Sequence, residues 1–133
     1  MKTTKAITSL GIWMDHSVAH LIEFNNAEMV SKKIEAKSSN GANKHGSHKG
    51  ENSMNQKENH QQAEFYKILG TEILKYDRLI LFGPTDAKLE LFHLLSLDHH
   101  FDKIIIELKQ TDKMTENQEH AFVRDYFSKH SNV

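Results

Sequence analysis

Residues 77–97 read DRLILFGPTDAKLELFHLLSL, and this stretch decides the fold class. Its first six residues are almost wholly apolar, which is typical of a strand buried on both faces of a mostly parallel sheet. Gly83-Pro84-Thr85 then ends the strand and starts a helix, because proline suits a first helical turn. Residues 103–108 (KIIIEL) predict a second buried strand. Together these segments predict an α/β fold with parallel strands.

Three segments upstream have the composition and alternation of β-strands. They span residues 6–14, 18–24 and 27–36, with short turns rich in Asp, Ser and Asn between them. Strands joined by such short turns predict a three-stranded antiparallel meander.

Two further helices complete the predicted order. Phe65, Leu69 and Ile73 share one helical stripe after about residue 60, and Thr115 with Gln118 fits a capping box before a last helix. The predicted order is therefore β-β-β-α-β-α-β-α. It indicates a ribonuclease H-like mixed sheet, in which right-handed crossovers place the later strands parallel to the first. We expect a single domain over residues 1–133.

The composition narrows the possible functions. The 133 residues include no cysteine, which excludes disulfides, thiolate metal sites and cysteine nucleophiles. The formal net charge is -1, so any nucleic-acid contact has to be local, and DNA is not an expected partner. No apolar run reaches membrane-spanning length, and the first residues lack the core of a signal peptide. We expect a soluble cytoplasmic protein with no membrane partner.

A long polar run separates the meander from the helices. Residues 37–62 read KSSNGANKHGSHKGENSMNQKENHQQ, and Ala42 and Met54 are their only apolar members. An insert this long in a compact domain is usually functional or a linker. We therefore predict a flexible polar loop over residues 37–62, presented by the rest of the chain.

The basic residues of this run suit contact with phosphates. A local positive cluster is formed by Lys32, Lys33, Lys44, His45, His48 and Lys49. Glycine and asparagine between them let backbone amides approach RNA, but no aromatic side chain is present for base stacking. The alternative is a tolerated insert without a role. Metal binding through the histidines is disfavoured, because no fixed spacing repeats among them, so we predict no metal site.

Three stretches carry a resemblance to a known family. They are WMDHSVAHLIEF (residues 13–24), FGPTDAKLELFHLL (residues 82–95) and TDKMTENQEHAFVRDYF (residues 111–127). The chain resembles small bacterial translational machinery proteins, which are similar to the middle domain of archaeal and eukaryotic class 1 release factors and of Pelota-type rescue factors. The resemblance covers nearly the whole chain outside the polar run.

The resemblance implies a role in translation. In release factors, the loop between the meander and the first helix carries the GGQ tripeptide that enters the peptidyl transferase centre. This chain reads KHGSHKGENSMNQ there and contains no GGQ. The resemblance therefore implies a ribosome-associated factor rather than a release enzyme, with rRNA as the expected partner and tRNA as a further candidate.

The first motif holds several residues of unknown role: Trp13, Asp15, His16, Ser17 and His20. An Asp after the first strand is similar to the carboxylate that ribonuclease H-like nucleases place there for Mg²⁺. Two-metal chemistry needs several converging carboxylates, and the later strands offer only Asp77 and Glu107. We favour a turn in which Asp15 and Ser17 bond the local backbone.

The segment Gly83-Pro84-Thr85 is a second candidate site, because a helix N-terminus can hold an anion and Lys88 lies nearby. Asp86 already places a negative charge there, which favours a structural turn and cap. No nucleotide or dinucleotide motif is present, and no cofactor is expected.

The function that we infer from the sequence is that of a translation-associated, ribosome- or tRNA-binding factor, and we do not expect an enzyme. The alternatives are a metal-dependent nuclease or peptidyl-tRNA hydrolase of ribonuclease H-like fold, or a small protein-binding module.

Overall fold

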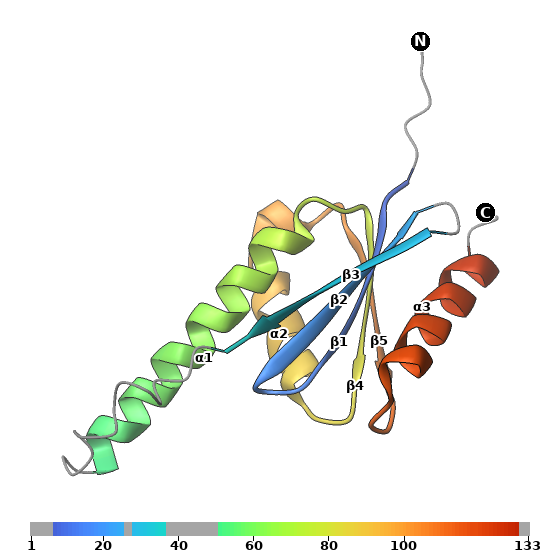
Figure 1. The fold of residues 1–133 in the computed structure, drawn as a ribbon. Helices are drawn as coiled ribbons and strands as arrows, with labels where there is room; N and C mark the ends of the chain where they lie inside the picture. The colour runs from blue at the N-terminus through green and yellow to red at the C-terminus, as the bar shows by residue number, and fades with distance from the viewer. Residues whose placement is uncertain (1–6, 26–27, 37–50, 131–133) are drawn as a thin grey trace.

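Five strands form one sheet, and helices cover both of its faces (Figure 1). The structure is a computed structural model that describes residues 7–25, 28–36 and 51–130. In chain order the elements are β1 (Ser9–Met14), β2 (Val18–Asn25), β3 (Glu28–Glu35), α1 (Glu51–Ile73), β4 (Arg78–Gly83), α2 (Ala87–Ser96), the short 3-10 helix η2 (His99–Phe101), β5 (Ile105–Gln110) and α3 (Glu116–His130).

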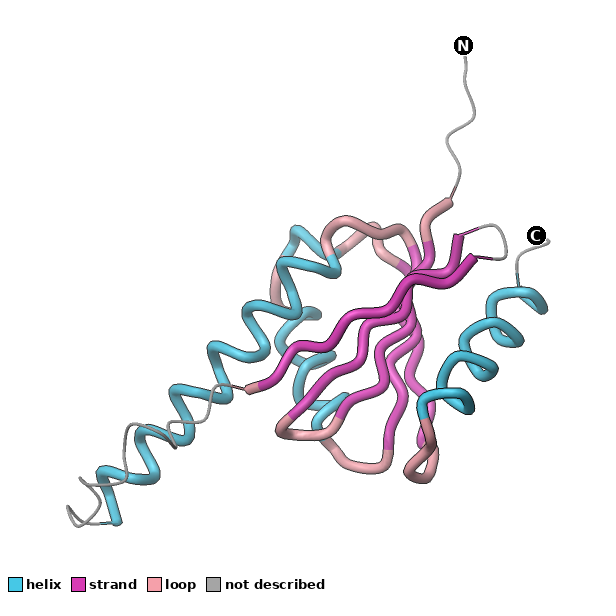
Figure 2. The backbone as a smooth tube through the Cα atoms, in the orientation of Figure 1, coloured by secondary structure: helices cyan, strands magenta, loops and turns pink. Residues whose placement is uncertain are grey.

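The strand order across the sheet is β3-β2-β1-β4-β5. Figure 2 shows the strands of the sheet in magenta. β1 pairs antiparallel with β2, and β2 pairs antiparallel with β3, which gives the predicted meander. β4 lies parallel to β1 and to β5. In this register, Ile12 on β1 lies beside Leu21 on β2 and beside Leu81 on β4. The predicted mixed α/β fold and its element order are confirmed.

Strand alternation divides the apolar side chains between two cores. Ile12 belongs to the core under α1 and α2, together with Phe65 and Leu91. Its neighbour Trp13 belongs to the core under α3, together with Phe127. The sheet is thus the middle of three layers (Figure 1).

The capping box at the start of α3 is confirmed. Gln118 N donates to Thr115 Oγ1 at 3.1 Å, and Thr115 N donates to Gln118 Oε1 at 2.9 Å. The two bonds satisfy amides that the first helical turn leaves without partners.

The predicted loop boundary is wrong at its C-terminal side. α1 begins at Glu51, so residues 51–62 of the predicted loop are helical, and residues 37–50 lie outside the described residues. The N-terminal half of α1 extends beyond the sheet (Figure 1). A helix with no core beside it needs no apolar stripe, and Glu, Gln, Lys and Met are good helix formers.

The predicted buried strand at residues 103–108 is also corrected. β5 spans Ile105–Gln110 and is an edge strand whose residues are exposed or half-buried. Ile105 itself is 60% exposed. Within the described part of the chain, no helix is long and apolar enough to cross a membrane.

Candidate functional site

The turn between β1 and β2 is built around the carboxylate of Asp15. Its Oδ1 accepts hydrogen bonds from Ser17 N (2.8 Å), Ser17 Oγ (3.0 Å) and Val18 N (3.0 Å). Burial alone would raise the pKa of Asp15, but the amides of Ser17 and Val18 outweigh it, and the pKa lies below its usual value. Oδ1 therefore acts as a turn acceptor, as the sequence indicated.

The same turn is hydrogen-bonded to the chain before and to the helix after residues 37–50, which we call the insert. Ala36 N, just after β3, donates to Ser17 O at 2.9 Å. Gln62 Nε2, on α1, donates to His16 O at 3.1 Å. The chain before residues 37–50 and the helix after them are therefore attached to one turn. We call His16, Ser17, Ala36 and Gln62 the insert base.

Glu90 connects the insert base to the two helices on that face. His16 Nε2 lies 3.2 Å from Glu90 Oε2, and Tyr66 OH on α1 donates to Glu90 Oε1 at 2.7 Å. The hydrogen bond from Tyr66, followed by the contact with His16, lowers the pKa of Glu90 although burial opposes this. Burial, reinforced by Glu90, raises the pKa of Tyr66. The three side chains join the turn, α1 and α2.

Trp13 and His20 belong to the opposite face of the sheet. The His20 ring stacks on Trp13 with a centroid distance of 5.1 Å, and its Nδ1 lies 2.8 Å from Glu119 Oε1 on α3. Glu119 is 1% exposed, and burial raises its pKa despite the contact with His20. The motif residues therefore do not form one cluster. Trp13 and His20 pack on the face covered by α3, whereas the carbonyl groups of His16 and Ser17 accept hydrogen bonds from Gln62 and Ala36.

The carboxylates of the sheet do not converge. Asp15 follows β1 and Asp77 precedes the adjacent parallel strand β4, which places them at opposite ends of these two strands. Asp77 Oδ2 accepts from Thr8 N at 3.0 Å, and Glu107 accepts from Tyr126 OH. Across residues 7–25, 28–36 and 51–130, no group of three or more His, Asp or Glu side chains can hold a metal ion. The described residues thus offer no site for two-metal chemistry.

The Gly83-Pro84-Thr85 segment makes structural contacts. Gly83 has φ +148, and a Cβ there would lie 2.3 Å from Met14 O. Lys88 is 2% exposed, and its Nζ donates to Thr85 O and to Gln110 Oε1, both at 2.7 Å. Burial lowers the pKa of Lys88. The ammonium group thus ties α2 to its own N-terminal turn and to β5.

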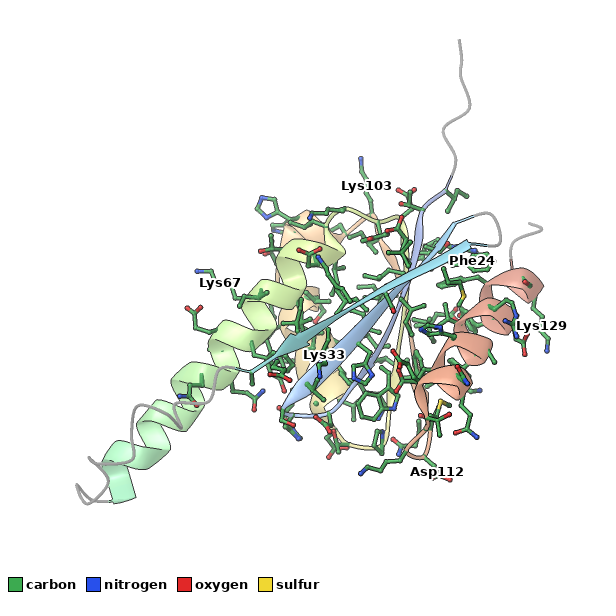
Figure 3. The ribbon with its side chains drawn as sticks, viewed as in Figure 1. Phe24, Lys33, Lys67, Lys103, Asp112 and Lys129 are labelled. Atoms are coloured by element: carbon green, nitrogen blue, oxygen red, sulfur yellow. The ribbon has the colours of Figure 1, made fainter. Side chains whose placement is uncertain are left out.

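Lys32 and Lys33 point to opposite faces because they are neighbours on a strand. Lys32 Nζ lies 3.2 Å from Glu72 Oε1 on α1, and Lys33 Nζ lies 3.4 Å from Glu35 Oε2. Figure 3 labels Lys33 on β3. The structure does not bring these two ammonium groups together.

The other basic residues of the predicted cluster, Lys44, His45, His48 and Lys49, lie outside the described residues.

No sequence pattern indicated a role for Gln62, Tyr66, Glu90 or Glu119. His16 and Glu90 are 74 residues apart, and His20 and Glu119 are 99 apart. Pattern and spacing within one segment carry no signal for such pairs. Glu90 and Glu119 lie within the stretches that carry the family resemblance, but the resemblance implies no role for either residue.

No protein-family model matches the chain, and no curated protein matches it. Solved structures do match. Pelota of Archaeoglobus fulgidus has a TM-score of 0.57 and 10% identity over 90% of this chain. Pelota of Thermoplasma acidophilum has a TM-score of 0.61 and 12% identity over 95% of this chain. The archaeal translation termination factor aRF1 has a TM-score of 0.53 and 15% identity over 93% of this chain.

The matched region is a part of each of these proteins. The chain covers 31%, 35% and 40% of their respective lengths. At such low identity a structural match shows a shared fold and leaves the function to be argued from the site. This chain has the fold of one portion of Pelota and of aRF1, with a three-stranded meander leading into alternating helices and strands.

Proposed function

We propose that this protein is a translation-related factor that binds the ribosome and contacts it through the insert at residues 37–50. One observation carries the proposal: the chain on both sides of the insert is attached to a single turn, by Ala36 N to Ser17 O and Gln62 Nε2 to His16 O. The shared fold supports the same role, because Pelota and aRF1 are the matched proteins and aRF1 is a translation termination factor.

The arrangement of the insert base suits a protruding contact. α1 follows residues 37–50 directly, and its N-terminal half extends beyond the sheet (Figure 1). The extended half of α1 is anchored at its inner end by Tyr66 and Gln62. α1 is one continuous helix from Glu51 to Ile73, so its first residue lies beyond the sheet. We infer that residues 37–50 reach a surface that the compact part of the domain does not touch.

The chemistry of the insert favours binding over catalysis. It holds Lys44, His45, His48 and Lys49 among glycines and contains no GGQ. The resemblance implies that it corresponds to the loop in which release factors carry GGQ. Lysines in a glycine-rich segment contact phosphates without reading sequence. We therefore propose rRNA as the bound surface, with tRNA as a second candidate ligand, and a cytoplasmic location with the ribosomes.

Co-sedimentation of the purified protein with ribosomes through a sucrose cushion tests the proposal. We expect the wild type to pellet with ribosomes at low salt. The variant with Lys44, His45, His48 and Lys49 all changed to Ala is expected to bind more weakly. Its loss of binding with rising salt is also expected to be shallower, because each lost phosphate contact removes roughly 0.7 to 0.9 from the slope of log K against log salt.

A matched control removes the same number of basic groups elsewhere. The four exposed residues to change to Ala are His93, His99, Lys103 and Lys129. Figure 3 labels Lys103 and Lys129 on parts of the fold remote from the insert base. We expect this control to pellet like the wild type. If both variants lose binding equally, general charge and not the insert is responsible. If the wild type stays in the supernatant at low salt, the proposal is wrong.

A further inference from the structure

An apolar groove lies between α1 and α2, on the face of the molecule away from α3. Its volume is about 400 Å³. The groove passes over Gly70, whose missing side chain leaves a hollow against Phe101 and Leu95; a Cβ at Gly70 would lie 3.4 Å from Phe101 Cζ. The lining residues include Tyr66, Leu91, Leu94, Leu95 and Phe101.

Leucine side chains project from both walls of this groove. Leu74 on the α1 side is 46% exposed, and Leu94 on α2 is 47% exposed. Exposed apolar groups are stabilised by removal from water, in proportion to the area that becomes covered. Exposed leucines beside an apolar groove form a surface that can pack against the same surface of a second copy.

The groove also carries one charge of each sign on opposite walls. Lys67 lies on α1, and Asp98 follows α2. The Asp98 side chain is 46% exposed; its Oδ1 accepts from His100 N and lies 2.7 Å from His100 Nδ1, which leaves Oδ2 for a second partner. Figure 3 shows Lys67 projecting from α1 away from the sheet. In a two-fold contact the same surface of both copies meets, so that surface must contain both partners of each ion pair. The groove contains both Lys67 and Asp98.

We propose that the α1–α2 groove is a homodimer interface, in which a second copy of this chain is the occupant. With the two-fold axis along the groove, α1 of each copy lies over α2 of the other. Leu94 and Leu74 of one copy then cover the hollow at Gly70 of the other, and Lys67 lies on the side of Asp98 of the second copy. The two α1 helices run in the same direction, so their extended N-terminal halves leave the dimer at one end.

Sedimentation velocity on the full chain, over a concentration series, tests this proposal independently of any ribosome binding. We expect a reversible monomer–dimer equilibrium for the wild type. Leu94→Glu places a carboxylate in the apolar contact and is expected to raise the dimer Kd by about tenfold or more. Leu89→Glu is the matched control, because Leu89 is on the same helix and 49% exposed but does not line the groove. It is expected to dimerise like the wild type.

A zero-length carbodiimide cross-link tests the geometry. In an equal mixture of ¹⁵N-labelled and unlabelled protein, we expect the Lys67–Asp98 peptide pair from the dimer band to include mixed-label pairs, which only a link between two copies gives. We also expect Lys67→Glu to weaken dimerisation several-fold with reduced salt dependence. Thermal unfolding followed by circular dichroism checks that each variant is folded. A wild type that remains monomeric at all concentrations overturns the proposal. So does a dimer that tolerates Leu94→Glu, or one that responds equally to Leu89→Glu.

Discussion

Replacing Asp15 by Ala and by Asn separates a turn acceptor from a catalytic carboxylate. Asp15→Ala removes the oxygen that accepts from Ser17 N, Ser17 Oγ and Val18 N. Asp15→Asn keeps one acceptor oxygen, removes the charge and replaces Oδ2 by an amide NH2 group. A metal-dependent hydrolase needs the charge, whereas the turn needs the acceptor. If Asp15 is a turn acceptor, Asp15→Ala destabilises the protein and Asp15→Asn is tolerated. If Asp15 is a catalytic carboxylate, both substitutions abolish activity.

The expected magnitude follows from the exposure of the donors. A hydrogen bond to a charged group contributes about 1.5 to 3 kcal/mol when it is well shielded, and side-chain caps of exposed backbone amides contribute about 1. The bonds to Ser17 are exposed, and the bond to Val18 is half-buried. We therefore expect Asp15→Ala to lower the free energy of unfolding by about 2 kcal/mol, and Asp15→Asn by less than about 1 kcal/mol.

Urea unfolding followed by circular dichroism measures both values. Because the folded-state pKa of Asp15 is depressed, its stabilisation is present above the unfolded value of 3.8 and is lost as the pH falls through the folded pKa. The difference between wild type and Asp15→Ala is expected to shrink in that acidic range. Ribosome co-sedimentation is expected to survive Asp15→Asn. An Asn variant as unstable as the Ala variant, or an Ala variant as stable as wild type, would refute this account of the turn.

Two further predictions concern the surroundings of this turn. Gly83→Ala forces a Cβ to 2.3 Å from Met14 O at φ +148 and is expected to destabilise by about 3 kcal/mol in urea unfolding. The control is Gly70→Ala on α1, where the added Cβ would lie 3.4 Å from its nearest neighbour. It is expected to leave the free energy of unfolding unchanged or to raise it by up to about 1 kcal/mol. Equal losses for the two variants would contradict the reasoning. Glu90→Gln is expected to lower stability above pH 4.5, with the difference closing as the pH falls through the depressed pKa of Glu90; a difference that grows in acid would contradict it.

The sequence predicted correctly the elements that a local residue pattern is enough to identify. β4 is buried on both faces, so its residues are continuously apolar and the segment is recognisable in isolation. The capping box of α3 is a contact between Thr115 and Gln118, three residues apart, and it is confirmed. Asp15 and Ser17 are likewise near neighbours, so their turn is legible in the sequence.

Two predictions failed because the burial of a segment depends on its neighbours in space. The isoleucines before and within β5 indicated a buried strand, but only the sheet order shows that β5 lies at an edge. Residues 51–62 lack an apolar stripe because this end of α1 extends beyond the sheet (Figure 1). Hydrophobic periodicity reports a helix only where the helix packs on a core.

The candidate site was predictable only in part. The sequence singled out Trp13, His16 and His20 without roles, and the structure shows that adjacent motif positions serve opposite faces of the sheet. Their partners Glu90 and Glu119 come from helices far along the chain. Long-range pairs of this kind arise from the topology, which no local pattern encodes.

The two edges of the sheet differ in how they meet other chains. An edge strand offers unpaired backbone groups to any extended segment, and natural proteins oppose this with lysines. β3 has Lys32 and Lys33 at its centre, so a second strand added there meets two ammonium groups. β5 begins with Ile105 and Ile106, and the first of them is largely exposed. β5 carries one lysine, Lys109, and it lies toward the other end of the strand. We therefore expect intermolecular strand pairing on heating to begin at the Ile105 end of β5, and a charge introduced there to oppose aggregation.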